Sequence, residues 1–471
     1  MTNRPIPALT PTTPGHHFVV YADACSGVPG ALHEETFATV NRVIQQLDSP
    51  PEFIAFPGDE IRGLTADGDE LRAQWRHWFD HEMAWLDRAA IPLYQTTANH
   101  TTYDPASEAI FRAVMAHLPR NGPPGQEGLS YFVRRSPVGA ADSSDDLLLI
   151  FVNTLWSGLG GEGYVELDWL EATLADHADA RHKIVFGHHP VFPINGFVGS
   201  HQREIAHEIG PKFWAILVRH GVLAYWCSHI LAFDVQVHDG VLQILTAGAG
   251  TAHRMPEEVE YLHAMQAALD SNGLRYQVLD TNGVAREWLT WPLVAPNPTA
   301  WQPLKQGTQP PPRQNALTPI TTNTPIALWQ VSGHTSSGHD GTPQTLLSLW
   351  DEGAALAPFW LGLLGCEQRL AILLAPQPGR SPHLWTGPTL ASDRPFSLQV
   401  ALHSGMGPGG LLWRWDERSP WSSLNGASAW GVERLPGTSS CSVGHAQRGQ
   451  QDRPFRGEQL SVAWQTLSSV L

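Results

Sequence analysis

The chain has 471 residues, which is more than one ordinary hydrophobic core needs, so we expect two domains. Hydrophobic residues make up 42% of the sequence and charged residues 16%, a composition typical of a well-packed soluble protein rather than a disordered one. The formal net charge of -16 argues against a nucleic-acid partner, because binding to a phosphate backbone relies on clustered Lys and Arg.

From about residue 17 to residue 192, short apolar runs alternate with longer stretches of helical periodicity. The apolar runs predict buried strands that end in polar residues, over 19–23, 53–59, 91–100, 147–154 and 183–192. The longer stretches predict amphipathic helices over 33–47, 69–89, 107–118 and 165–178. Such alternation indicates crossover connections and a largely buried sheet with helices outside it.

A further helix and strand are predicted over 203–220 and 222–229, followed by two hairpins that turn at Asp239-Gly240 and Asn282-Gly283. The first domain is therefore expected to span residues 1–292. Residues 293–325 are rich in Pro, Thr, Gln and Asn without periodicity, which is typical of a linker. Short alternating strands separated by Gly, Pro and Ser then predict an all-β sandwich over 326–471.

Polar side chains follow several of the predicted strands. Asp23, Asp59, the pair Asn99-His100, His188 and His229 stand in this order along the chain. The carboxyl ends of strands in an open α/β sheet converge on one crevice, where ligands and metals bind. A set of carboxylate, amide and imidazole ligands suits divalent Zn, Mn or Fe rather than an all-oxygen calcium cage.

These motifs read DAC, PGDE, ANH, GHHP and SHIL, and they resemble the calcineurin-like metallophosphoesterase superfamily, which includes the purple acid phosphatases. The family signature runs DxH, GD, GNH, GH and GHxH. The resemblance covers about residues 17–292. It implies a metallophosphoesterase-type α/β sandwich that hydrolyses a small phosphomonoester or phosphodiester, with water activated by one or two divalent ions of Fe, Mn or Zn.

The resemblance also implies a role for each matched residue. Asp59 would bridge two metals, and His100 would protonate the leaving group. Asp23 would bind the first metal. The shell of the second metal would be completed by Asn99, His188 and His229.

The first-metal side departs from the family pattern. The two remaining ligands of that metal are histidines in the family, whereas this sequence has Cys25 and Leu231. Leucine cannot bind a metal, while a cysteine thiolate binds Zn or Fe and can replace the lost histidine. A replacement ligand could also come from the alternating residues Asp234, Gln236 and His238, although a solvated hairpin face is the plainer interpretation.

Two further residues are candidates for contact with the substrate phosphate. Arg62, in GDEIRG, is similar to the phosphate-binding arginine of the protein-phosphatase branch but comes one residue early. His189 directly follows the predicted ligand His188. A surface-loop role is the alternative for His189.

The C-terminal region is similar to concanavalin A-like lectin/glucanase jelly-roll domains, on the stretches 395–424 and 452–464. The resemblance leaves carbohydrate binding open, since tryptophan faces stack on sugar rings, and core packing is the alternative role for those tryptophans. A rival to the enzyme is therefore a catalytically degenerate phosphoesterase fold that acts as a binding module for a carbohydrate or a protein partner.

The remaining features bear on the cellular compartment. Cys25, Cys227, Cys366 and Cys441 form no CxxC pair, so they indicate neither a disulfide framework nor a zinc ribbon. The N-terminus lacks the apolar stretch of a secretory signal, and no apolar run reaches the length of a membrane-spanning helix. A cytoplasmic protein without a membrane partner is the expectation.

Overall fold

The computed structural model describes residues 5–137, 146–193, 203–251, 261–292, 301–304, 325–338, 340–350, 359–374, 383–403, 411–427, 440–445 and 453–468. The chain divides into two compact units. The first contains Met1–Val235 and Val241–Trp291, and the second contains Gln236–Gly240 and Pro292–Leu471. Most of the predicted linker over 293–325 lies outside the described residues.

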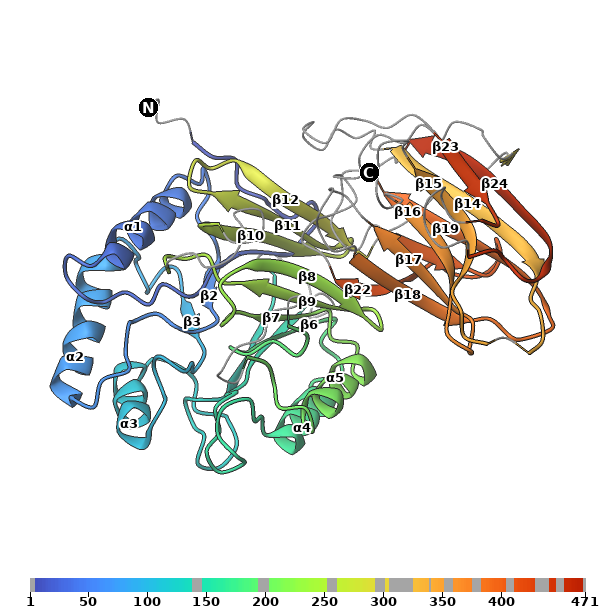
Figure 1. The fold of residues 1–471 in the computed structure, drawn as a ribbon. Helices are drawn as coiled ribbons and strands as arrows, with labels where there is room; N and C mark the ends of the chain where they lie inside the picture. Colours follow the sequence, from blue (N-terminus) through green and yellow to red (C-terminus); the bar gives the residue numbers. More distant parts are fainter. Residues whose placement is uncertain are drawn as a thin grey trace. The chain divides into compact units, whose positions relative to one another are not determined.

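One sheet of the first unit has the order β12-β11-β10-β1-β2-β3. The parallel strands are β1 (His16–Val20), β2 (Phe53–Phe56) and β3 (Leu93–Gln95). The antiparallel strands are β10 (His263–Asp270), β11 (Gly273–Asp280) and β12 (Ala285–Trp291). The helices α1 (Leu32–Gln45), α2 (Gly68–His77) and α3 (Pro105–Val114) flank this sheet (Figure 1).

The other sheet of the first unit runs β8-β9-β7-β6-β5-β4. Its strands are β4 (Tyr131–Arg135), β5 (Leu147–Phe151), β6 (His182–Phe186), β7 (Ala224–Cys227), β8 (Phe233–His238) and β9 (Val241–Thr246). The strands β5, β6, β7 and β9 are parallel. The helices α4 (Leu167–Asp176) and α5 (Gly210–Arg219) pack on it through a buried apolar cluster that includes Leu170 and Phe213 (Figure 1).

Aromatic rings fill the space between these two sheets. Six of them form a closed circuit in which successive ring centroids lie 4.8 to 5.8 Å apart, in the order Phe18, Phe53, Tyr94, Phe151, Phe186 and Trp226. The first three come from β1, β2 and β3, and the last three come from β5, β6 and β7. Because aromatic pairs add directional stabilisation to area burial, this circuit fixes the sheets face to face. It therefore brings the carboxyl ends of both sets of parallel strands to one edge.

The helix boundaries differ from the sequence prediction in two places. The helix predicted over 69–89 ends as an α-helix at His77 and continues as one π-helical segment, Trp78–Glu82. The helix predicted over 203–220 begins only at Gly210, because Pro211 at the first turn is suited to start a helix and cannot continue one. The strands β4 and β10 have no counterpart among the predicted strands.

The second unit consists of antiparallel strands in its described residues. One sheet has the order β13-β24-β14-β19-β20-β21, and the other contains β23-β15-β16-β17-β18-β22. The apolar core between them includes Trp329, Phe359 and Trp385. The bounds are β13 (Gln302–Pro303), β14 (Pro325–His334), β15 (Gln344–Trp350), β16 (Phe359–Leu364), β17 (Arg369–Leu374), β18 (His383–Thr389), β19 (Pro395–His403), β20 (Leu411–Arg414), β21 (Ser422–Ser423), β22 (Asn425–Ala427), β23 (Ser440–Val443) and β24 (Glu458–Ser468).

Candidate metal centre

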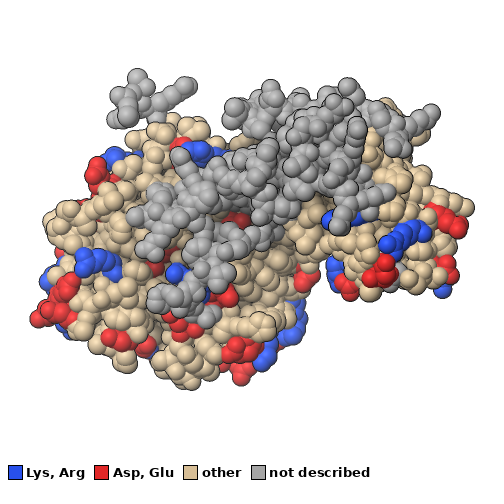
Figure 2. All heavy atoms as spheres, in the orientation of Figure 1, with Lys and Arg blue, Asp and Glu red and all other residues tan. Residues whose placement is uncertain are grey.

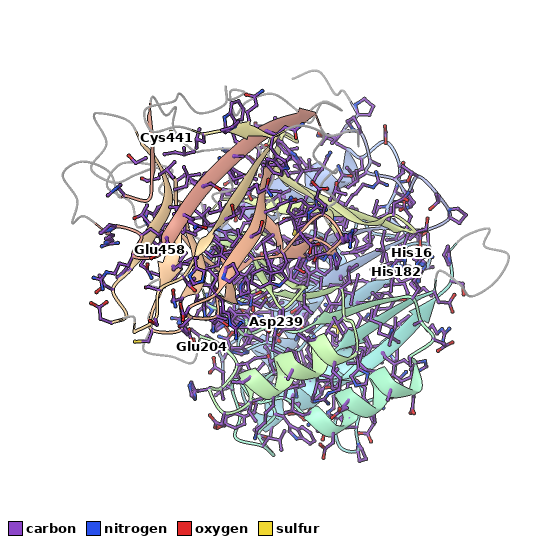
Figure 3. The ribbon with its side chains drawn as sticks, turned by 90° about the vertical axis from the view of Figure 1, so that its right-hand side faces the viewer. His16, His182, Glu204, Asp239, Cys441 and Glu458 are labelled. Atoms are coloured by element: carbon purple, nitrogen blue, oxygen red, sulfur yellow. The ribbon has the colours of Figure 1, made fainter. Side chains whose placement is uncertain are left out.

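The five polar motifs lie at the carboxyl ends of five parallel strands of the first unit. Asp23 follows β1, Asp59 follows β2, Asn99-His100 follows β3, His188 follows β6 and His229 follows β7. The opposite, amino-terminal ends of β1 and β6 are marked by His16 and His182 in Figure 3. The strand polarity thus delivers all these side chains to the same edge of the two facing sheets.

The backbone at this edge is held in an unusual conformation. Asp23, Cys25, Asp59 and His229 have φ values of 61°, 44°, 57° and 69°, in the left-handed region that residues other than glycine rarely adopt. The loop after β1 also contacts the loop after β2, since the Cys25 amide donates to the Asp59 carbonyl at 2.7 Å. The His229 amide donates to Asp23 Oδ2 at 2.9 Å. Strain of this kind concentrates where side chains must be aimed at a ligand.

The side chains expected to bind the second metal converge on one point. His188 is fully buried, and its Nδ1 donates to the Pro57 carbonyl at 2.9 Å, because a carbonyl oxygen can only accept. The neutral ring therefore has a lone pair on Nε2, which lies 2.8 Å from Asn99 Oδ1 and 3.4 Å from Asp59 Oδ2. His229 Nδ1 lies 3.1 Å from the same nitrogen. Acceptor atoms gathered this closely suit a cation among them.

The carboxylate of Asp59 lies between two histidine rings. Its Oδ1 accepts the His100 backbone N–H at 3.1 Å, and its Oδ2 lies 3.4 Å from His188 Nε2 and 4.0 Å from His100 Nε2. Burial alone would raise the pKa of Asp59, but the neighbouring His188 and His100 outweigh it and lower this pKa. Asp59 is thus an ionised carboxylate that faces both sides of the centre.

The first-metal side holds two buried acidic groups. Asp23 Oδ1 is buried and has no hydrogen-bond partner among the described residues. Burial raises the pKa of Asp23 well above its ordinary value, and the neighbouring Asp59 and Cys25 raise it further. Cys25, Asp59 and His100 each offer a ligand atom within 4.8 Å of the other two. The residues on this side therefore fit a cation, which would offset the crowded negative charge.

Leu231 and the possible replacement ligands Asp234, Gln236 and His238 lie near the end of the second sheet of the first unit. Leu231 packs against the apolar cluster beneath α4 and α5, in keeping with its inability to bind a metal. His238 Nε2 lies 3.0 Å from Gln236 Oε1 along β8. Among the described His, Cys, Asp and Glu residues, the groups with metal-binding spacing include Cys25 but neither Asp234 nor His238.

His100 occupies a position that suits proton transfer. Its Nδ1 donates to the Arg62 carbonyl at 2.6 Å, which leaves Nε2 facing the centre, and its side chain is 25% exposed. Gly63 permits this approach, because a Cβ atom at that position would collide with the His100 carbonyl oxygen. The Arg62 backbone thus orients the ring, while the Arg62 side chain is exposed at the surface.

His189 is fully buried, and its contact with a substrate phosphate stays a prediction. Its Nε2 lies 3.1 Å from Glu162 Oε1, and its Nδ1 lies 2.8 Å from Thr154 Oγ1. Burial lowers the pKa of His189 well below the ordinary value, and the neighbouring His188 lowers it further. Glu162 is absent from the sequence-based set. The only sign of it in the sequence is the glycine-rich stretch GLGGEG around it.

Comparisons with known proteins give matches among solved structures. No protein-family model and no curated protein sequence matches. Among solved structures, a purple acid phosphatase from yellow lupin is 11% identical with a TM-score of 0.44, and the match covers 60% of this chain and 54% of that one. GAP50, the anchor in the inner membrane complex of Plasmodium, is 12% identical with a TM-score of 0.40 and coverages of 59% and 89%.

A third similar structure is the CBM40 module of a Ruminococcus gnavus sialidase, bound to α2,6-sialyllactose. It is 15% identical with a TM-score of 0.23, and the match covers 35% of this chain and 89% of that one. The chain spans about half the length of the lupin phosphatase. All three TM-scores lie below 0.5, so these similarities say nothing about the chemistry of the site.

The distribution of charge and the length of the helices bear on the partners that the chain can contact. Among the described residues on the face shown in Figure 2, Lys and Arg side chains are interspersed with Asp and Glu rather than gathered in one basic area. Within the described residues, no helix has the length and apolar character needed to cross a bilayer.

Proposed function

We propose that this chain is a metal-dependent phosphoesterase that hydrolyses a small phosphomonoester or phosphodiester. The observation that carries the proposal is the convergence of His188 Nε2, Asn99 Oδ1 and Asp59 Oδ2 on one point. His188 Nε2 lies 2.8 Å and 3.4 Å from the other two atoms. The four residues that would hold the metal are Asp59, Asn99, His188 and His229. A divalent ion of Zn, Mn or Fe suits this mixed donor set and, when bound, supplies charge neutralisation and a lowered pKa of water.

The chain's own residues supply the remaining chemistry. The bond from His100 Nδ1 to the Arg62 carbonyl fixes the ring, so its Nε2 carries the transferable proton toward the leaving oxygen. General-acid catalysis of this kind contributes about 10²–10⁴-fold to the rate. Asp59 Oδ2, 4.0 Å from His100 Nε2, stabilises the protonated ring until the transfer occurs. Arg62 follows Asp59 closely in the sequence, and a contact between its exposed side chain and substrate phosphate stays a prediction.

The test combines metal analysis with hydrolysis assays on nitrophenyl phosphate monoesters and diesters. We expect the purified protein to bind Zn, Mn or Fe and to hydrolyse at least one of these substrates. His188→Ala should lose metal and turnover together, whereas His100→Ala should keep metal and lose turnover. Metal-free protein that stays inactive after all three ions are added would contradict the proposal. Full activity of His100→Ala would exclude His100 as the proton donor.

A non-hydrolysing binding module is the alternative function. The observation that favours it is Leu231, whose side chain packs into the apolar cluster where the family pattern has a ligand. In that case metal binding, if it occurs, should not be accompanied by hydrolysis of either class of ester. The same assay therefore separates the two functions.

Carbohydrate binding by the second unit is proposed as an accompanying activity. Trp415 is 38% exposed, and its ring centroid lies 5.2 Å from that of the half-buried Trp413. An exposed indole face can stack on a sugar ring, whereas Trp329 and Trp385 are buried in the core and cannot. We expect Trp415→Ala to lose the binding that the unaltered chain gives on a glycan array. Leu384→Ala is the matched control and should keep this binding, because it removes a 43% exposed apolar side chain that has no indole face.

A further inference from the structure

A second group of metal-binding side chains lies beside the candidate centre. Glu162, His189 and His229 each offer one ligand atom within 4.8 Å of the other two. Glu162 Oε1 lies 3.1 Å from His189 Nε2 and 3.9 Å from His229 Nε2. Two donors about 2.0–2.2 Å from one Zn²⁺ in tetrahedral geometry lie roughly 3.3–3.6 Å apart. The measured distances bracket this separation.

A structured loop positions Glu162. The segment between β5 and α4 folds back on itself through a bridge between Leu155 and Tyr164, and the Gly163 amide donates to the Thr154 carbonyl at 2.8 Å. Gly161 and Gly163, on either side of Glu162, have φ values of 96° and 87°. The side chain of Glu162 is 34% exposed, so a hydrated cation can reach it from solvent.

The ring of His189 is oriented as a ligand. Thr154 Oγ1 lies 2.8 Å from His189 Nδ1, and the Tyr225 hydroxyl donates to the His189 carbonyl at 2.6 Å. When the ring proton is on Nδ1, Thr154 accepts it and the lone pair on Nε2 points at Glu162. A metal-binding histidine commonly donates its other N–H to such an oxygen.

His229 connects this group to the first one. Its Nδ1 lies 3.0 Å from Asn99 Oδ1 and its Nε2 lies 3.9 Å from Glu162 Oε1, so its two ring nitrogens face two different donor sets. We infer that the chain binds a pair of divalent cations on opposite sides of the His229 ring, with the second cation between Glu162 and His189. A ring that binds through both nitrogens has no N–H, so filling both positions releases one proton from His229 to solvent.

This arrangement differs from a pair bridged by Asp59. On the Cys25 side, the group of residues with metal-binding spacing includes His100, and the proposed function uses Nε2 of that ring for proton transfer. On the Glu162 side, the ligands are separate from His100. The inference rests on the proposed function for the cation among Asp59, Asn99 and His188, and it adds the position of the other cation.

The test is a Zn²⁺ titration of the metal-stripped, full-length protein, followed by elemental analysis of the bound metal after gel filtration. We expect two equivalents for the unaltered chain, one for Glu162→Gln and two for Cys25→Ser. Glu208→Gln is the matched control and should keep two, because it removes a carboxylate that accepts from Tyr164 of the same loop. Circular dichroism of each variant checks that it is folded.

Three outcomes would overturn the inference: two equivalents retained by folded Glu162→Gln, one equivalent for folded Cys25→Ser, or fewer than two for the unaltered chain. Asn99→Ala in the same titration separates this failure from that of the proposed function. If Asn99→Ala loses an equivalent while Glu162→Gln loses none, the proposed centre stands and the second position is wrong. If Glu162→Gln loses an equivalent while Asn99→Ala loses none, the second position stands and the proposed centre is wrong.

Discussion

Adding Zn²⁺ to the metal-free protein should raise the melting temperature of the first unit, and Asn99→Ala or His188→Ala should remove the part of this rise that comes from the cation bound at Asn99 and His188. In the metal-free protein, His188 Nε2 lies 2.8 Å from Asn99 Oδ1 and 3.4 Å from Asp59 Oδ2, with no positive charge among these acceptors when the ring is neutral. A cation can bind these side chains in the folded chain, where they lie together. It does not bind them in the unfolded chain, where they are dispersed. Its binding free energy therefore adds to the free energy of unfolding.

The size of the shift follows from the size of the unit. A ligand present at about 1,000 times its Kd stabilises the folded state by about 4 kcal/mol. The first unit has roughly 290 residues, and an unfolding entropy of about 2.1 cal/mol/K per residue gives roughly 0.6 kcal/mol/K. The cation bound at Asn99 and His188 should therefore raise the melting temperature by about 7 °C.

Differential scanning calorimetry of the stripped protein, with and without Zn²⁺, measures this rise. His177→Ala is the matched control, because it removes a histidine at the end of α4, away from the strand ends that carry the centre. An equal rise in Asn99→Ala, His188→Ala and the control would show that the stabilising metal binds elsewhere.

Two more predictions concern residues that support the fold and the centre. Burial would raise the pKa of Glu52, but hydrogen bonds with His16 and His17 outweigh it and lower this pKa to about 2. The ionised Glu52 therefore stabilises the fold fully above its unfolded pKa of 4.5, and this stabilisation is lost as the pH falls through 2. Glu52→Gln should thus cost up to about 3 kcal/mol of unfolding free energy near pH 6 and almost nothing near pH 2, as urea titrations at both pH values can measure. Gly58→Ala should cost about 1–3 kcal/mol and weaken metal binding, because its Cβ would lie 2.8 Å from His188 Nδ1. Gly125→Ala shares the positive φ but has open space around it, so equal losses in both glycine variants would contradict the steric explanation.

Much of the candidate centre could be predicted because its proposed ligands directly follow apolar strands. Asp23, Asp59 and His188 each come within a few residues of a strand end, and parallel strands that share a sheet deliver such residues to one edge. The motif order therefore carried spatial information that single residues did not.

The rest of the centre depends on contacts that local sequence does not encode. Glu162 reaches His189 only because the bridge between Leu155 and Tyr164 folds its loop back, and neither glycines nor a lone glutamate predict that path. The π-helical turn after His77 likewise interrupts a periodicity that looks continuous in the sequence. The position of the Leu231 side chain depends on its packing against the apolar cluster under α4 and α5, which forms only in the folded unit.

The buried carboxyl of Asp23 serves either the stability of the fold or the binding of a cation. Asp23 Oδ1 is buried without a hydrogen-bond partner among the described residues, while Oδ2 accepts the His229 amide. Leaving a buried polar atom unsatisfied costs about 1–3 kcal/mol, and the neighbouring Asp59 and Cys25 raise the pKa of Asp23, which disfavours its ionised form further. Asp23→Asn keeps an acceptor for His229 and removes the charge, so the metal-free variant should unfold at higher urea concentration than the unaltered chain. The same variant should bind Zn²⁺ more weakly, whereas Asp69→Asn, at a side chain that is 97% exposed, should change neither quantity. If Asp23→Asn destabilises the metal-free protein, then Asp23 is a structural group, and the left-handed backbone that aims it has an origin other than cation binding.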